Sequence, residues 1–174
     1  MLLADMLARS RAAEEAAAAL YRRWAAASRS DPRLCALWTD LARDEEGHAR
    51  TIAVAQADLP AVRGWRTRID GWRESLDAIE EHLRAAERLA PDASVAQQLA
   101  AALEIELTEM DALRFLVLDL AGAPEPPAHT DLHACRLADA ATVLTTDAGV
   151  GLRAALLRVR AHMASAPFAP EGPT

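Results

Sequence analysis

Lysine and asparagine are absent from this 174-residue chain, and cysteine and aromatic residues are scarce. All 19 basic residues are therefore arginine, a pattern typical of a GC-rich coding bias rather than of phosphate recognition. The net charge of −7 argues against non-specific nucleic-acid binding and is compatible with cation binding. Hydrophobic residues make up 52% of the chain, much of it alanine, and glycine is rare. This composition predicts an almost all-α protein.

The two cysteines, Cys35 and Cys135, are isolated, so the chain encodes no zinc ribbon and no rubredoxin-like iron site. The first residues combine no basic stretch with a long apolar run, which argues against a signal peptide. No uncharged apolar stretch reaches the roughly 18 residues that a membrane span needs. We therefore expect a cytoplasmic protein without a membrane or nucleic-acid partner.

Apolar residues recur at three- and four-residue steps along most of the chain. Asp31 and Pro32 suit the start of a helix, and the short break before them makes the first two helices antiparallel neighbours. The last helical stretch is interrupted near residues 147–151 and forms either one broken helix or two. The predicted helices span residues 3–28, 32–57, 72–89, 92–121, 130–145 and 150–164.

The predicted topology is two antiparallel helical hairpins joined by a long crossover, which is the arrangement of one class of four-helix bundle. Residues 58–91 form this crossover and carry a helix of their own on the outside of the bundle. Residues 1–165 are expected to form a single domain. Residues 166–174 are expected to be a flexible tail.

Three acidic features indicate a metal site: Glu14, the Glu45-x-x-His48 motif, and the Glu106-x-x-Glu109 motif. Glu45 and His48 share one helix face, and carboxylate with imidazole suits iron, manganese or zinc. Glu14 and Glu45 lie about 16 and about 15 residues from the turn near residue 30, so antiparallel helices bring them to the same height. Glu14 has apolar neighbours, where a carboxylate is costly unless it is paired or bound to a cation.

Several of these assignments have rivals in the sequence. Glu15 competes with Glu14, and Glu46 competes with Glu45, although only Glu45 has a histidine three residues later. Glu104 is expected to be solvated, whereas Glu106 and Glu109 share a face. At the matching depth of the last helix, Asp139 is the nearest carboxylate and Thr142 stands where a histidine would complete a second motif. The remaining nearby histidines are expected at the surface: His129, His133 and His162.

The stretches EEAAAALYRRWAAASRSDPRLCALWTDLARDEEGHARTI and AAALEIELTEMDALRFLVL resemble the rubrerythrin-type domains of the ferritin-like superfamily. The resemblance covers residues 10 to about 120. It implies a ferritin-like four-helix bundle, which often pairs as a homodimer and typically holds two irons that react with O₂ or peroxide. By resemblance, Glu14 is a terminal ligand, Glu45 a bridging carboxylate and His48 a ligand to the same metal as Glu14. Glu106 is the terminal carboxylate of the second metal, with Glu109 as the alternative.

By the same resemblance, Tyr21 would contact the metal ligands without binding the metal itself. The alternative is that Tyr21 is an aromatic residue packed in the core. The chain departs from the family because it has no second Glu-x-x-His motif. This absence favours one metal ion over two, held by Glu14, Glu45 and His48 with water. The ion is expected to be iron, with zinc or manganese as alternatives, unless arginine or water satisfies the carboxylates instead.

Two functions follow from this degenerate site. One is a metal-binding oxidoreductase or metal handler, which would need a separate electron donor if it is redox-active. The other is a non-catalytic ferritin-like bundle that acts as a structural or regulatory homodimer.

Overall fold

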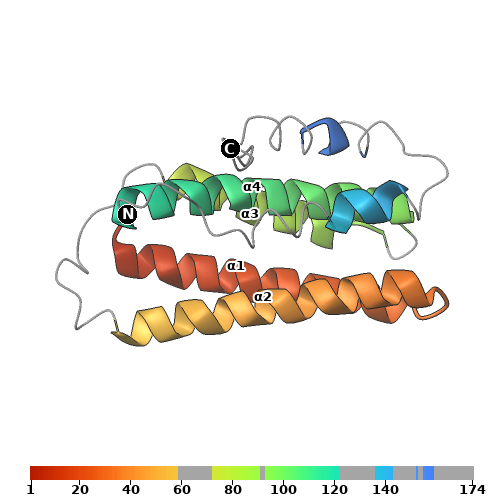
Figure 1. Ribbon diagram of the computed structural model, residues 1–174, viewed down its shortest axis with the longest axis horizontal. Helices are drawn as coiled ribbons and strands as arrows, with labels where there is room; N and C mark the ends of the chain where they lie inside the picture. Colours follow the sequence, from red (N-terminus) through yellow and green to blue (C-terminus); the bar gives the residue numbers. More distant parts are fainter. Residues whose placement is uncertain (59–71, 91–92, 122–135, 143–151, 153–154, 159–174) are drawn as a thin grey trace, which may run out of the picture.

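The computed structural model describes residues 1–58, 72–90, 93–121, 136–142, 152 and 155–158, and its account of side chains in the 93–121 segment ends at Thr108. Four long helices run through these residues: α1 (Leu3–Ala27), α2 (Pro32–Asp58), α3 (Trp72–Glu87) and α4 (Val95–Ala121), as Figure 1 shows. Residues 136–142 and 155–158 are also helical. No strand occurs within these ranges, so the predicted all-α fold class is confirmed.

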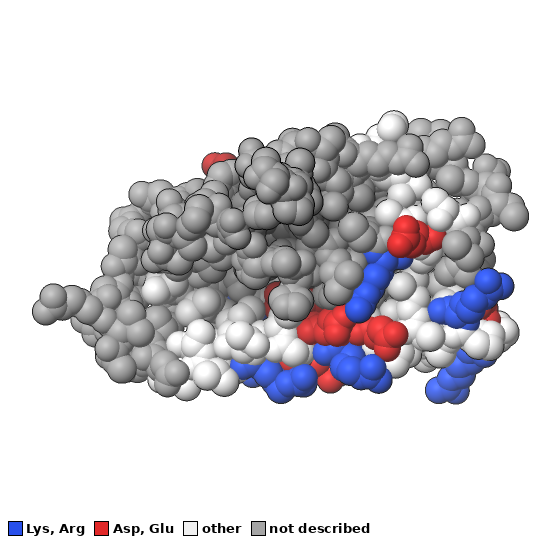
Figure 2. Space-filling view, in the orientation of Figure 1, with Lys and Arg blue, Asp and Glu red and all other residues white. Residues whose placement is uncertain are grey.

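Helices α1 and α2 form an antiparallel hairpin whose turn is fixed by Asp31 (Figure 1). The carboxylate oxygen Oδ1 of Asp31 accepts hydrogen bonds from the backbone N–H of Arg33 at 3.0 Å and of Leu34 at 3.2 Å. Asp31 thus satisfies amide groups that the first turn of α2 leaves without a helical partner. Figure 2 shows arginines and carboxylates gathered over the lower part of the molecule, where α1 and α2 lie in Figure 1.

The start of α4 is capped by a reciprocal pair of polar side chains. The backbone N–H of Ser94 donates to the side-chain oxygen of Gln97 at 2.9 Å, and the backbone N–H of Gln97 donates to the Ser94 hydroxyl at 3.3 Å. This capping box sets the beginning of the helix that carries Glu104 and Glu106.

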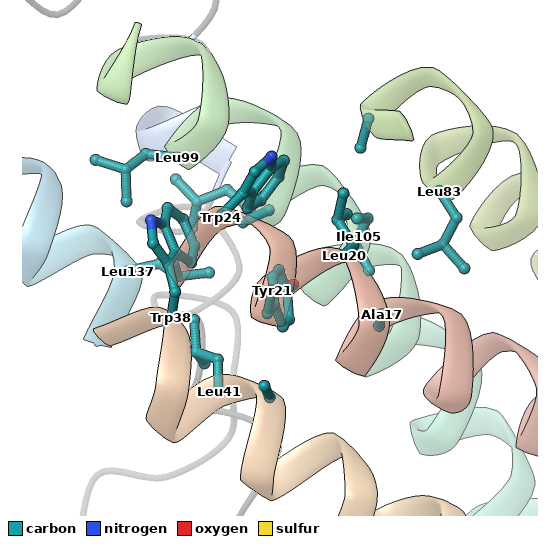
Figure 3. Close-up of a cluster of buried hydrophobic side chains, with 14 of the residues drawn as sticks. Ala17, Leu20, Tyr21, Trp24, Trp38, Leu41, Leu83, Leu99, Ile105 and Leu137 are labelled. Atoms are coloured by element: carbon teal, nitrogen blue, oxygen red, sulfur yellow. The ribbon is translucent and has the colours of Figure 1, made fainter. Parts of the chain in front are cut away.

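An aromatic cluster fills the core between α1 and α2 (Figure 3). The ring of Tyr21 stacks on Trp38 with 5.7 Å between ring centroids, and Trp24 tilts against Trp38 at 4.9 Å. Leu99 of α4 and Leu137 of the 136–142 helix lie beside these rings and are fully buried. Because α1, α2, α4 and a later segment share one core, the positions of side chains on all four are coupled.

Helix α3 packs against both α1 and α4. Its apolar residues Leu76, Ile79 and Leu83 lie at three- and four-residue steps, and all three are buried. Arg9 of α1 donates to Asp77 at 2.6 Å and to Glu80 at 2.7 Å on the neighbouring face of α3. The helix that we expected on the outside of a bundle is therefore itself part of the hydrophobic core.

The 136–142 helix is anchored to α2. Leu137 and Ala141 are buried, and Arg136 forms an ion pair with Asp44 at 2.8 Å. The predicted break near residues 147–151 and the predicted tail at 166–174 lie outside the described residues. None of the helices within the described ranges is both long enough and apolar enough to cross a membrane.

Candidate metal centre

Three side chains from α1 and α2 converge between the two helices: Glu14 of α1, and Glu45 and His48 of α2. The imidazole Nδ1 of His48 lies 3.0 Å from Oε2 of Glu45 and 3.4 Å from Oε2 of Glu14. One ligand atom from each of the three residues lies within 4.8 Å of the other two. The equal heights of Glu14 and Glu45 that helical rise predicts are therefore realised in the folded chain.

Burial decides between the neighbouring glutamates that the sequence left as alternatives. Glu14 is 6% exposed and Glu45 is 0% exposed, which places both carboxylates in the protein interior. Their neighbours Glu15 and Glu46 face outward and are held by arginines of α1. These surface ion pairs are Arg11–Glu15 and Arg22–Glu46.

Burial also shifts the protonation of the cluster. Removal of Glu14 from water raises its pKa to about 8, with the nearby Glu45 carboxylate contributing to this shift and His48 opposing it. Hydrogen bonding to Glu14 and Glu45 raises the pKa of His48 to about 10, against the opposing effect of its own partial burial. At neutral pH the cluster without metal therefore retains protons that Glu14, Glu45 and His48 share.

The donor set suits a divalent cation. Ligands about 2.0–2.2 Å from an ion lie about 3–4.4 Å from one another, and the observed separations of 3.0 and 3.4 Å fall in this range. Oε2 of Glu14 is buried and lies 3.4 Å from Nδ1 of His48, the same nitrogen that contacts Glu45. The side chain of His48 is 35% exposed, so the cluster is closed on the core side and open to solvent through the histidine.

Glu106 of α4 occupies a different setting. It is 3% exposed, and its Oε1 accepts a hydrogen bond of 2.7 Å from the Tyr21 hydroxyl. Glu104 is less buried and pairs with Arg158, as expected for the solvated member of the two. Among the described residues, Glu106 is not part of the group whose ligand atoms lie within 4.8 Å of one another. The side chain of Glu109 lies outside the described residues.

Tyr21 is a packed core aromatic, as one interpretation of the sequence predicts, and it also donates a hydrogen bond to a buried carboxylate. Its partner, however, is Glu106 rather than Glu14. Sequence reasoning did not find this contact, because the two residues are 85 positions apart and nothing in their spacing signals it.

Asp139, the carboxylate nearest to the position of a second motif, is exposed, and so is Thr142. The Thr142 hydroxyl donates to the backbone oxygen of Asp139 at 2.7 Å, a local helical contact. The two residues therefore do not add a ligand to the cluster. His129, His133 and His162 lie outside the described residues, as does Cys135.

Fold and site together define an all-α protein with a buried two-carboxylate, one-histidine cluster that could hold a metal ion. Comparisons of the chain with protein-family models, with curated proteins and with solved structures give no match.

Proposed function

We propose that this protein is a ferritin-like four-helix bundle that binds one divalent metal ion through Glu14, Glu45 and His48. The observation that carries the proposal is the convergence of these ligand atoms within 4.8 Å, with both carboxylates buried. A buried carboxylate pair is costly in a protein interior unless a cation or protons offset its charge. A divalent ion offsets both carboxylates at once and leaves the imidazole neutral.

The ligand types support iron as the first candidate, with manganese and zinc as alternatives. One ion is favoured over two because the sequence has no second Glu-x-x-His motif. Among the described side chains of α4, Glu106 is the one buried carboxylate. It accepts a hydrogen bond from the Tyr21 hydroxyl. A bound iron would supply redox chemistry, and Glu14, Glu45 and His48 would hold it while water enters beside the exposed edge of His48.

Metal content and calorimetry test this proposal directly. Purified protein without chelator is titrated with Fe²⁺ under anaerobic conditions, and with Mn²⁺ and Zn²⁺, and one ion per chain is expected. Glu14→Gln, Glu45→Gln and His48→Ala should each weaken binding at least about 100-fold, since each removes a direct ligand. The chain offers matched controls, because Glu15→Gln and Glu46→Gln make the same change one residue away on the exposed side. Equal loss in a variant and its control would contradict the assigned ligands.

A specific contact favours a second candidate function, the non-catalytic ferritin-like bundle that acts as a structural or regulatory homodimer. Nδ1 of His48 already lies against both carboxylates, so a protonated imidazole can offset their charge without any metal. Protein that takes up no stoichiometric metal after loading, and that sediments as a dimer, would support this candidate. Metal uptake that depends on His48 would exclude it in favour of the first.

A further inference from the structure

Tyr21 is the only tyrosine of the chain, and it lies in the protein interior against two indole rings. Its ring stacks on Trp38 and contacts Trp24 with 5.8 Å between ring centroids (Figure 3). Tyrosine and tryptophan are the aromatic side chains that can lose one electron and persist as radicals. The cluster therefore has the composition of an electron donor as well as that of a hydrophobic core.

The aromatic cluster lies about two helical turns from the candidate metal centre. Tyr21 follows Glu14 by seven residues on α1, and Trp38 precedes Glu45 by seven residues on α2. Seven residues are close to two full turns, so each ring lies on the same helix face as its ligand, about 10 Å away along the axis. Electrons cross such distances inside proteins without a bound carrier between donor and acceptor.

The Tyr21 hydroxyl has a proton acceptor in place. It donates a hydrogen bond of 2.7 Å to Oε1 of Glu106, whose side chain is 3% exposed. An oxidised phenol is a strong acid, so its proton moves along this hydrogen bond as the electron leaves the ring. When the acceptor is a carboxylate, the products are a neutral tyrosyl radical and a neutral carboxyl group, and no charge remains on the buried pair. Loss of a buried charge favours the oxidised state.

The neighbouring indole of Trp38 lacks this advantage. Trp38 is fully buried, and its Nε1 has no hydrogen-bond partner within the described part of the chain. An oxidised Trp38 would keep its proton and place a positive charge in an apolar core, which is costly. Because the two rings are stacked, an electron passes readily from Tyr21 to an oxidised Trp38. The radical is therefore expected to reside on Tyr21.

We propose that Tyr21 gives one electron to a peroxide that is reduced at the candidate metal centre, and that Glu106 accepts the proton of Tyr21. This inference rests on the proposed function, with iron as the metal. It gives the only tyrosine a part in the chemistry of the site, although Tyr21 is not a metal ligand.

The electron count of a one-iron centre is what requires such a donor. Reduction of one hydrogen peroxide to two water molecules takes two electrons and two protons. A single Fe²⁺ supplies one electron and becomes Fe³⁺. Tyr21 supplies the second electron, and its phenolic proton passes to Glu106. The two protons that complete the water molecules come from solvent at the exposed edge of His48.

Hydrogen peroxide provides a direct test, because the two sources of electrons can be counted. Anaerobic protein loaded with one Fe²⁺ per chain receives a limiting amount of peroxide, and rapid quenching into a ferrous chelator measures the Fe²⁺ that remains. The parent should oxidise one Fe²⁺ per peroxide and show a tyrosyl radical by electron paramagnetic resonance after rapid freezing. Tyr21→Phe should oxidise twice as much Fe²⁺ per peroxide, because iron then supplies both electrons.

Metal-free protein tests Tyr21 and its proton acceptor apart from iron. Illumination with a ruthenium tris-bipyridine complex and persulfate generates a one-electron oxidant, and the parent should form a tyrosyl radical. Glu106→Gln should lower the radical yield several-fold, because an amide is a far weaker base than a carboxylate. Glu104→Gln is the matched control, since it makes the same change two residues away on a less buried side chain that pairs with Arg158. It should leave the yield unchanged, and circular dichroism should confirm that all variants remain folded.

Three results would overturn the inference. The metal-free parent could form no tyrosyl radical, Glu106→Gln could lower the yield no more than Glu104→Gln does, or Tyr21→Phe could oxidise no more Fe²⁺ per peroxide than the parent. Any of these in a protein that binds one iron leaves the proposed function intact. Protein that binds no iron in the calorimetric titration contradicts the proposed function itself and, with it, the peroxide step.

Discussion

Replacing Tyr21 with phenylalanine tests the contact that ties α1 to α4. The hydroxyl is the only group removed, so the fully buried ring keeps its place against Trp38 and Trp24. What disappears is a 2.7 Å hydrogen bond to Oε1 of Glu106, a carboxylate that is 3% exposed. Loss of one hydrogen bond to a buried carboxyl group costs about 1–3 kcal/mol.

In a chain of this size, about 1 kcal/mol corresponds to a shift of roughly 2–4 °C in the unfolding temperature. Tyr21→Phe should therefore lower that temperature by roughly 2–12 °C, measured by circular dichroism in metal-free protein. Glu106→Gln keeps the shape of its side chain and removes its charge. A double-mutant cycle of the two changes should give a coupling free energy of about 1 kcal/mol or more.

Two outcomes would refute this reasoning. A loss below about 0.5 kcal/mol in Tyr21→Phe would mean that water replaces the hydroxyl in the folded protein. Additive effects of Tyr21→Phe and Glu106→Gln would mean that the two groups do not interact in solution. Tyr21→Leu supplies the comparison for packing, because it removes the ring contacts with Trp24 and Trp38 as well as the hydroxyl.

Three further outcomes are expected. Without metal, thermal stability should fall as pH rises, because folding raises the pKa of Glu14 from its ordinary value of 4.5 to about 8, and that of His48 from 6.5 to about 10. Glu14→Gln should flatten the lower part of that pH profile. Metal affinity, followed by calorimetry, should rise with pH and be accompanied by proton release, since Glu14 and His48 must lose their protons to bind. Asp31→Ala should cost about 1 kcal/mol through loss of the α2 cap, whereas exposed Asp40→Ala should cost little.

Part of the site was predictable because the rise per residue of a regular helix is fixed, so the number of residues from a turn gives a height along the helix. A short turn and a fixed rise per residue place Glu14 and Glu45 at one height, and their ligand atoms do converge with that of His48. The choice between Glu14 and Glu15 was not predictable in this way. Adjacent residues point about 100° apart on a helix, so the side that faces the core depends on how α1 packs.

The exposure of Asp139 has a related physical cause. Counting residues from the turn that joins two helices estimates the height of a residue along its helix. It does not estimate the direction in which the side chain points. In the structure Leu137 and Ala141 face the core, which leaves Asp139 exposed between them. The Tyr21–Glu106 contact depends in the same way on how α1 and α4 are rotated against each other, which no local pattern encodes.

The two proposed functions differ in what offsets the charge of Glu14 and Glu45. In one it is a bound cation, and in the other it is protons on the cluster. At pH 7 the exchange must remove protons from Glu14, with a pKa of about 8, and from His48, with a pKa of about 10. At roughly 1.4 kcal/mol per unit this amounts to a few kcal/mol, with the share of His48 reduced because a third of its side chain faces solvent. Because metal binding must remove these protons, the cost falls as pH rises, and a cation should displace the protons more readily at pH 8 than at pH 7.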